Sequence, residues 1–172
     1  MRLQPEKSFA AVAILVLVLL GMTTTATQAA TTELSPAPDF VLKSRSGDNL
    51  RLSEQVGNVV IVNFWASWCG PCREELPAFE QMYQTYADMG VTVLAVNVDD
   101  DPAKANTLLK DIEVSFPVLF DPEGEVSELY DVSAMPTTVL IDRFGNARLV
   151  HKGYKSGDEA KYEQALNALL RE

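Results

Sequence analysis

The chain has 172 residues, of which 47% are hydrophobic and 22% are charged, and its net charge at pH 7 is −10. This composition is typical of a folded globular domain rather than a disordered chain. The acidic excess disfavours nucleic-acid binding, because contacts with phosphates require a basic surface that the sequence lacks.

The first residues have the layout of a secretory signal. Arg2 and Lys7 precede an apolar run over residues 9–22, and small and polar residues follow it. The run is shorter than the ~20 apolar residues of a membrane-spanning helix. We therefore expect residues 1–29 to be a signal peptide cut after Ala29 or, if uncleaved, an N-terminal membrane anchor. Either outcome predicts a periplasmic or cell-envelope protein on the extracytoplasmic side, which contacts the membrane only through this segment.

Residues 30–38, rich in Thr, Ser and Pro, predict a linker, and the lack of a later break predicts one domain over residues 35–172. The domain is expected to start with a β-hairpin over residues 39–52, followed by a fully buried strand over residues 57–66 and a helix from about 69 to 89. Further strands are expected at 91–98, 116–121, 137–142 and 147–154, and further helices at 99–112 and 156–172. This order predicts an α/β fold, a three-layer α/β/α sandwich with a central mixed β-sheet and an added N-terminal β-hairpin.

The only two cysteines, Cys69 and Cys72, are separated by two residues where the buried strand meets the helix. A disulfide that closes so short a loop stabilises a fold little. Structural zinc needs about four ligands, and beyond the cysteines the chain offers one histidine, His151, far away in sequence. A redox-active pair is therefore the favoured interpretation, because CxxC beside a βαβ pattern is its expected signature. We assign no role to His151.

The position of the pair predicts a different role for each of the two sulfurs. Free N–H groups and the helix dipole favour a thiolate at Cys69, which we expect to be the attacking nucleophile. Cys72 lies one turn inward, where it can resolve a mixed disulfide formed at Cys69. Gly70 allows a tight turn between them, and Pro71 stiffens the first helical turn.

The segments "NFWASWCGPC", "APDF" and "MPTTVLID" together resemble the thioredoxin superfamily, and most of all its TlpA/ResA-like secreted or membrane-anchored thiol–disulfide oxidoreductases. The resemblance covers about residues 35–172. It implies a thioredoxin-like fold in which the Cys69–Cys72 disulfide is the redox group, with no cofactor and no metal. It also implies that Pro136 is a cis-proline facing the disulfide, and that Met135 offers its backbone to the substrate. We expect Trp68 to shield Cys69 and to offer partners an apolar surface.

Glu75 stands three residues after the second cysteine, where TlpA/ResA-like members carry a glutamate. Asn63 occupies the position of the buried aspartate of cytoplasmic thioredoxins. The resemblance therefore implies that Glu75 takes the Cys72 proton or tunes the cysteine pKa values. The alternative is an ordinary acid of the first helical turn that interacts with the helix dipole. The sequence does not choose between the two.

These observations predict an extracytoplasmic protein disulfide reductase that acts by dithiol–disulfide exchange. The resemblance implies protein disulfide substrates such as apocytochrome c, a CcdA/DsbD-type membrane electron donor, and a role in cytochrome c maturation. A disulfide-forming oxidase and a non-enzymatic copper carrier remain alternatives. A peroxidase, suggested by "APDF", is disfavoured because Ala66 stands where peroxiredoxins carry Thr or Ser. The segment "NVDDD" lacks the glycine and glutamate of a calcium loop, so we interpret its acids as strand-end and helix-capping residues, with Asp101 as the cap.

Overall fold

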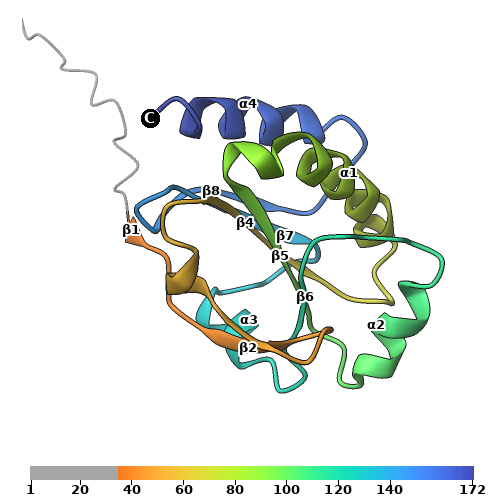
Figure 1. Cartoon of the computed structure of the whole chain (residues 1–172). Helices are drawn as coiled ribbons and strands as arrows, with labels where there is room; N and C mark the ends of the chain where they lie inside the picture. The colour runs from red at the N-terminus through yellow and green to blue at the C-terminus, as the bar shows by residue number, and fades with distance from the viewer. Residues whose placement is uncertain (1–34) are drawn as a thin grey trace, which may run out of the picture. The chain divides into compact units, whose positions relative to one another are not determined.

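An eight-stranded mixed sheet organises residues 35–172, the part of the chain that the computed structural model describes (Figure 1). The strands follow one another across the sheet in the order β1-β8-β7-β4-β5-β6-β2-β3. Their bounds are β1 Ser35–Pro36, β2 Val41–Ser44, β3 Asn49–Arg51, β4 Val59–Trp65, β5 Val91–Asn97, β6 Val118–Phe120, β7 Thr137–Ile141 and β8 Asn146–Lys152. The expected signal peptide or anchor over residues 1–29 and the start of the predicted linker lie outside the described residues.

Within residues 35–172, four α-helices cover the two faces of this sheet. They are α1 Gly70–Tyr86, α2 Pro102–Leu108, α3 Glu125–Leu129 and α4 Glu159–Leu169. Helices α1 and α4 lie together on one face, where Phe79 and Leu166 belong to the same buried cluster (Figure 1). Helix α3 packs through Val126 into the cluster on the other face. The predicted three-layer thioredoxin-like architecture is confirmed.

Strand β4 is central to both hydrophobic cores, which explains its nearly unbroken apolar sequence. All seven of its residues are buried. It pairs in parallel with β5 and antiparallel with β7. Because side chains alternate along a strand, Ile61 and Trp65 enter the core under α1, and Val62 and Phe64 enter the opposite core. Asn63 is the polar exception on the face toward α1.

The structure adds one strand and one α-helix that the sequence pattern did not predict. Strand β1 has only two residues, too few to show a period, and is held by pairing of Ser35 with Ala147 of β8. Helix α3 has five residues, and its amides are capped from a distance by Asp121, which accepts from Ser127 N at 2.8 Å. Helix α2 ends at Leu108, four residues earlier than predicted. The predicted N-terminal hairpin is present as the antiparallel pair β2–β3 and joins the sheet through β6.

Asp101 caps α2 as expected, because its side chain accepts a hydrogen bond from Ala103 N at 2.9 Å. Helix α1 contains a proline, Pro77, in its interior. Among residues 35–172, no helix is both long enough and apolar enough to cross a membrane.

Candidate active site

Cys69 and Cys72 form a disulfide at the junction between β4 and α1. Cys69 is the N-cap residue of α1, and its sulfur accepts a hydrogen bond from the Cys72 amide at 3.2 Å. This amide is one of the N–H groups that a helix N-terminus leaves unpaired. The same contact would stabilise a Cys69 thiolate after reduction, since charge strengthens such a bond. The structure therefore places the pair at the helix start that the sequence predicted.

A shallow hollow of about 440 Å³ opens beside the disulfide, and Cys69 lines it while Cys72 does not. Its wall is formed by the following residues: Trp68, Cys69, Pro71, Val132, Ser133, Ala134 and Met135. The Trp68 side chain is 66% exposed at its rim, an unusual position for a large apolar ring. The Met135–Pro136 peptide bond is cis, as expected, and Pro136 is buried behind it. The hollow is thus mainly apolar and gives access to one sulfur of the pair.

The loop before the disulfide is fixed by Asp99, for which the sequence pattern predicted only a strand-end acid. Asp99 is buried and accepts hydrogen bonds from the amide and the hydroxyl of Ser67 at 2.9 and 3.0 Å. The Asn97 side chain donates to it at 2.8 Å. On the other side, Arg73 donates to the Ser67 carbonyl at 2.6 Å. The chain that carries Trp68 is therefore held on both sides, and no local sequence signal identifies Asp99 as its anchor.

Glu75 is fully buried beneath the first turns of α1. Its Oε2 accepts from the Asn63 side-chain amide at 2.8 Å, and its Oε1 accepts from the Thr138 hydroxyl at 3.1 Å and the Tyr162 hydroxyl at 2.8 Å. Helical spacing puts it one turn from Cys72. This enclosure by three side chains favours the proton-acceptor interpretation over that of an ordinary acid of the first helical turn, which would be solvated.

Burial raises the pKa of Glu75 from its ordinary value to about 7. The three hydrogen bonds oppose this shift, because they favour the ionised carboxylate, and the negative charge of Asp158 adds to it. A carboxyl group with a pKa near 7 can both accept and release a proton at neutral pH. This is the electrostatic property that a proton acceptor for Cys72 requires.

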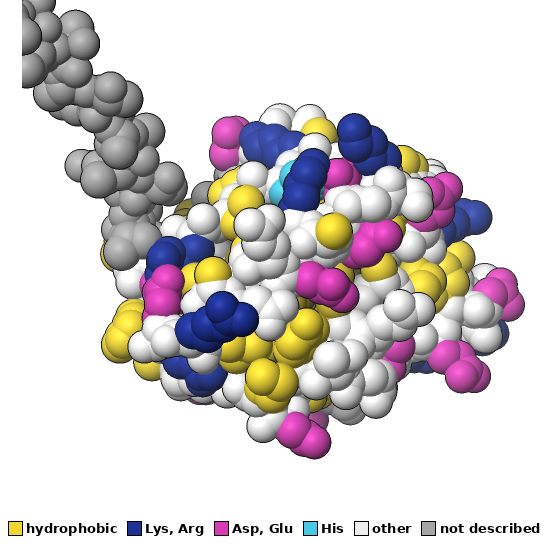
Figure 2. Space-filling view, turned by 90° about the horizontal axis from the view of Figure 1, so that it is seen from above, with side chains coloured by type: hydrophobic (Ala, Val, Ile, Leu, Met, Phe, Trp, Pro, Cys, Tyr) yellow, Lys and Arg dark blue, Asp and Glu magenta, His cyan; other side chains and the backbone are white. Residues whose placement is uncertain are grey.

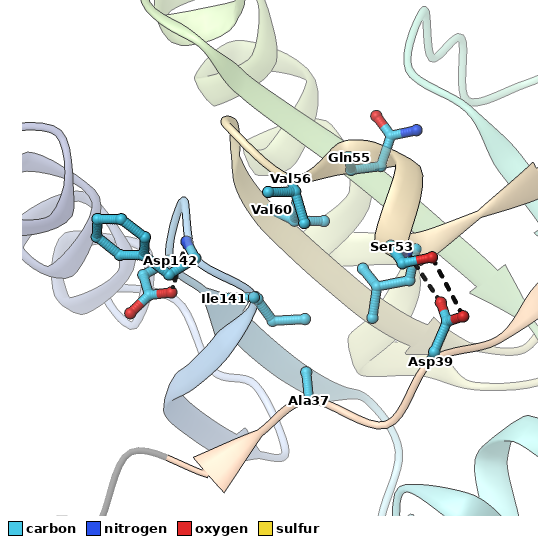
Figure 3. A pocket seen from close by; sticks show the side chains of 11 residues that line it. Ala37, Asp39, Ser53, Gln55, Val56, Val60, Ile141 and Asp142 are labelled. Carbon is cyan, nitrogen blue, oxygen red and sulfur yellow. Dashed lines mark hydrogen bonds between the residues drawn. The ribbon is translucent and has the colours of Figure 1, made fainter.

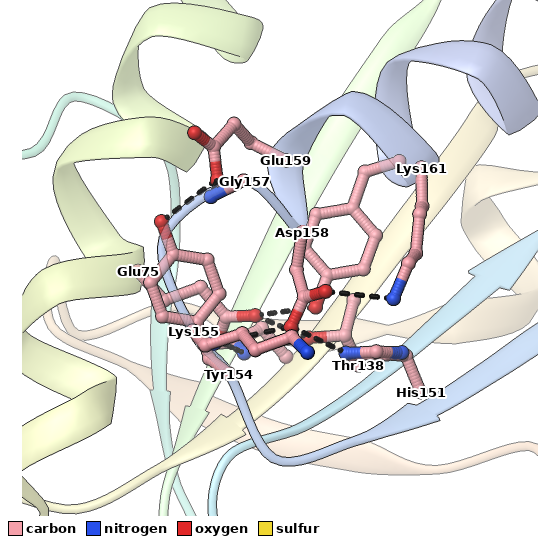
Figure 4. A network of polar contacts seen from close by, with 11 residues as sticks. Glu75, Thr138, His151, Tyr154, Lys155, Gly157, Asp158, Glu159 and Lys161 are labelled. Carbon is pink, nitrogen blue, oxygen red and sulfur yellow. Dashed lines mark hydrogen bonds and ion pairs between the residues drawn. The ribbon is translucent and has the colours of Figure 1, made fainter.

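A second polar cluster adjoins Glu75 on the side of α4 (Figure 4). Asp158 accepts from the Lys155 amide at 3.1 Å and from the Lys161 ammonium group at 2.7 Å, and pairs with His151 Nε2 at 3.2 Å. The His151 ring packs edge-on against the ring of Tyr162, with centroids 5.4 Å apart. His151, to which the sequence assigned no role, thus packs against Tyr162, one of the donors to Glu75.

Two buried polar atoms on this face of β4 have no hydrogen-bond partner among the described residues. They are Asn63 Oδ1 and Trp65 Nε1. Asn63 donates through its side-chain nitrogen to both Glu75 and Thr138, and its side-chain oxygen therefore has no hydrogen-bond donor among the described residues. Rotation of the amide group would present this oxygen, an acceptor, to a protonated Glu75.

A smaller hollow of about 190 Å³ lies at the other end of β4, where Val60 lines it (Figure 3). Ala37, Ile141 and Val56 make its wall apolar, and Ser53 donates to Asp39 at its edge. This hollow contains no cysteine and is separated from the disulfide by the length of β4.

Among residues 35–172, no group of three or more His, Cys, Asp or Glu side chains could hold a metal ion. Figure 2 shows acidic and basic side chains interspersed over the face seen from above.

A disulfide at a helix N-terminus, in this fold and beside an apolar hollow, defines a thiol–disulfide oxidoreductase of the thioredoxin-like class. Residues 34–150 match the AhpC/TSA family. The thiol–disulfide oxidoreductase ResA of Bacillus subtilis is 39% identical over 121 residues, which are 70% of this chain and 68% of ResA. The ResA protein of Geobacillus kaustophilus is 38% identical over 119 residues, 69% of this chain and 68% of that protein. The chain therefore belongs to the AhpC/TSA family and is a ResA-type thiol–disulfide oxidoreductase.

Solved structures agree with this assignment. A Chlorobium tepidum chain assigned as a thiol:disulfide interchange protein DsbE superimposes with a TM-score of 0.77 at 42% identity, over 80% of this chain and 96% of that one. The exposed lipoprotein thioredoxin Etrx1 of Streptococcus pneumoniae gives a TM-score of 0.68 at 31% identity, over 77% of this chain and all of that one. The fold and the redox class are thus shared across both.

Proposed function

We propose that this chain is an extracytoplasmic protein disulfide reductase in which Cys69 attacks the substrate and Cys72 resolves the product. The observation that carries the proposal is the asymmetry of the pair, since Cys69 lines the hollow and Cys72 is enclosed behind it. The Cys69 thiolate attacks a substrate disulfide and one substrate sulfur leaves as a thiolate. Cys72 then attacks Cys69, which releases the second sulfur and re-forms the disulfide. Two electrons pass to the substrate, and its two sulfurs take up two protons.

Glu75 serves this reaction as the acceptor of the Cys72 proton, with its pKa near 7 in support. Trp68, Met135 and Pro136 form the contact surface for an extended substrate segment beside Cys69. Gly70 and Pro71 shape the turn between the two cysteines. The disulfide is itself the redox group, so the reaction needs no cofactor or metal.

The protein is proposed to act in the periplasm or cell envelope, tethered by or released from residues 1–29. The signal-like sequence supports this location, and a relative at 31% identity is described as an exposed lipoprotein. Outside the cytoplasm the pair must be reduced again through the membrane, so we propose a CcdA/DsbD-type electron donor. Protein disulfides such as those of apocytochrome c, in cytochrome c maturation, are the proposed substrates.

The equilibrium reduction potential of the Cys69–Cys72 pair tests the direction of electron flow. Redox-buffer titration followed by Trp fluorescence should give a value near the ~−270 mV of thioredoxin, and a value near ~−120 mV would make the protein a disulfide-forming oxidase. In cells, Cys72→Ser should trap mixed disulfides with substrates, whereas Cys69→Ser should trap none. Tight stoichiometric copper binding by the reduced protein, without trapped partners, would instead indicate the carrier.

A further inference from the structure

The Glu75 carboxyl group is held by donors from three separate elements. Asn63 belongs to β4, Thr138 to β7 and Tyr162 to α4. Tyr162 is 87 residues away in sequence and is the donor from the helix that lies beside α1. Helix α4 therefore contacts the buried carboxyl group of Glu75 through the hydroxyl group of Tyr162.

Packing fixes the place of that hydroxyl group. Tyr162 is fully buried, and its ring stacks on Phe79 with centroids 5.4 Å apart and planes 30° apart. The His151 ring closes a second side at 82°. Because a buried ring in such contacts cannot turn without displacing its neighbours, the Tyr162 hydroxyl stays directed at Glu75 Oε1.

We propose that Tyr162 is a positioning residue for the redox reaction: its hydroxyl orients the Glu75 carboxyl group and sets the pH at which that group accepts the Cys72 proton. The inference rests on the proposed role of Glu75. Burial and the neighbouring Glu75 carboxylate raise the pKa of Tyr162 well above its usual value, so the phenol keeps its own proton. It donates a hydrogen bond throughout the cycle, and the proton that moves is the one from Cys72.

The charged and titratable groups around this pair come from the following parts of the chain: Glu74 from α1, His151 from β8, Tyr154 and Asp158 from the segment before α4, and Glu159 and Lys161 from α4. Asp158 raises the pKa of Glu75, while the Tyr162 hydroxyl lowers it. Removal of the hydroxyl should therefore raise the pKa of Glu75, since the ionised form loses a hydrogen-bond donor.

The experiment compares Tyr162→Phe with the unchanged protein. Infrared difference spectra across pH, with the carboxyl band assigned by its loss in Glu75→Gln, give the titration midpoint of Glu75. Loss of a hydrogen bond to a charged group should move this midpoint up by about one to two pH units. From a starting pKa of about 7, the ionised fraction at pH 7 then falls about 5- to 50-fold. The rate at which Cys72 resolves a mixed disulfide should fall by the same factor and recover at higher pH.

A matched control is Tyr130→Phe, which removes a tyrosine hydroxyl that donates to the Pro38 carbonyl at 2.7 Å, at a site bordering the opposite core. It should leave the midpoint and the pH profile unchanged. An unchanged midpoint in Tyr162→Phe, or equal slowing at every pH, would overturn the positioning role alone, provided that Glu75→Gln alters the profile. If Glu75→Gln leaves the profile unchanged, the proposed role of Glu75 fails as well.

Discussion

Replacement of Glu75 by glutamine should stabilise the oxidised protein at pH 8 and leave its stability at pH 4 nearly unchanged. The folded-state pKa of Glu75 is about 7, against an ordinary value of 4.5. A raised pKa means that the folded state binds the proton more tightly than the unfolded state does. The favourable contribution is therefore complete below about pH 4.5 and is lost as the pH rises through 7.

The size of the effect follows from the difference between the two pKa values. Each pH unit of difference corresponds to about 1.4 kcal/mol, so ionisation of the buried carboxyl group lowers the free energy of unfolding by about 3 kcal/mol at pH 8. Glutamine avoids this loss because it stays neutral. Its carbonyl oxygen can accept from Tyr162 and Thr138, and its amide can donate to Asn63 Oδ1, the oxygen that lacks a partner in the unchanged protein.

The assay is urea unfolding of both oxidised proteins at several values between pH 4 and pH 8.5, followed by Trp fluorescence. The difference between them cancels the titration of all other groups. We expect the glutamine variant to gain about 3 kcal/mol on passing from pH 4 to pH 8. A difference that is the same at pH 5 and pH 8 would refute the reasoning, because it would mean that the pKa of Glu75 in the folded protein is not raised above its value in the unfolded chain.

Three further predictions follow from single contacts. Trp68→Ala should change the free energy of unfolding by less than about 0.5 kcal/mol, since the ring is exposed. In stopped-flow assays the same variant should reduce protein disulfides more slowly, with a smaller effect on a small aromatic disulfide. Equal slowing of both substrates would count against a docking role for Trp68. Asp99→Ala should destabilise the protein by about 1–3 kcal/mol in urea unfolding, because the Ser67 amide loses its buried acceptor, and an unchanged midpoint would contradict this. Asp101→Ala should lower the stability by about 1 kcal/mol through loss of the α2 cap, whereas Asp101→Asn should restore most of it.

Much of the fold could be predicted because the relevant signals are local. The run over residues 59–65 is apolar at every position but one, and a strand buried on both faces needs such a run. The CxxC motif from Cys69 to Cys72 spans four positions and lies at the start of a helix, which Pro71 marks in the sequence. The elements that were missed, β1 and α3, have two and five residues, which are too short for a period to show. Their stability comes from pairing with β8 and from the distant cap Asp121.

The redox class of this protein could be predicted from the sequence alone, because the two cysteines, the turn between them and the start of the helix are contiguous. The role of Glu75 stayed open, since its spacing from Cys72 fits both a proton acceptor and an ordinary acid of the first helical turn that interacts with the helix dipole. The tertiary structure decided that it is buried, because Thr138 and Tyr162 reach it from 63 and 87 residues away. A pKa depends on the desolvation and hydrogen bonds that such distant groups impose, and no local pattern encodes them.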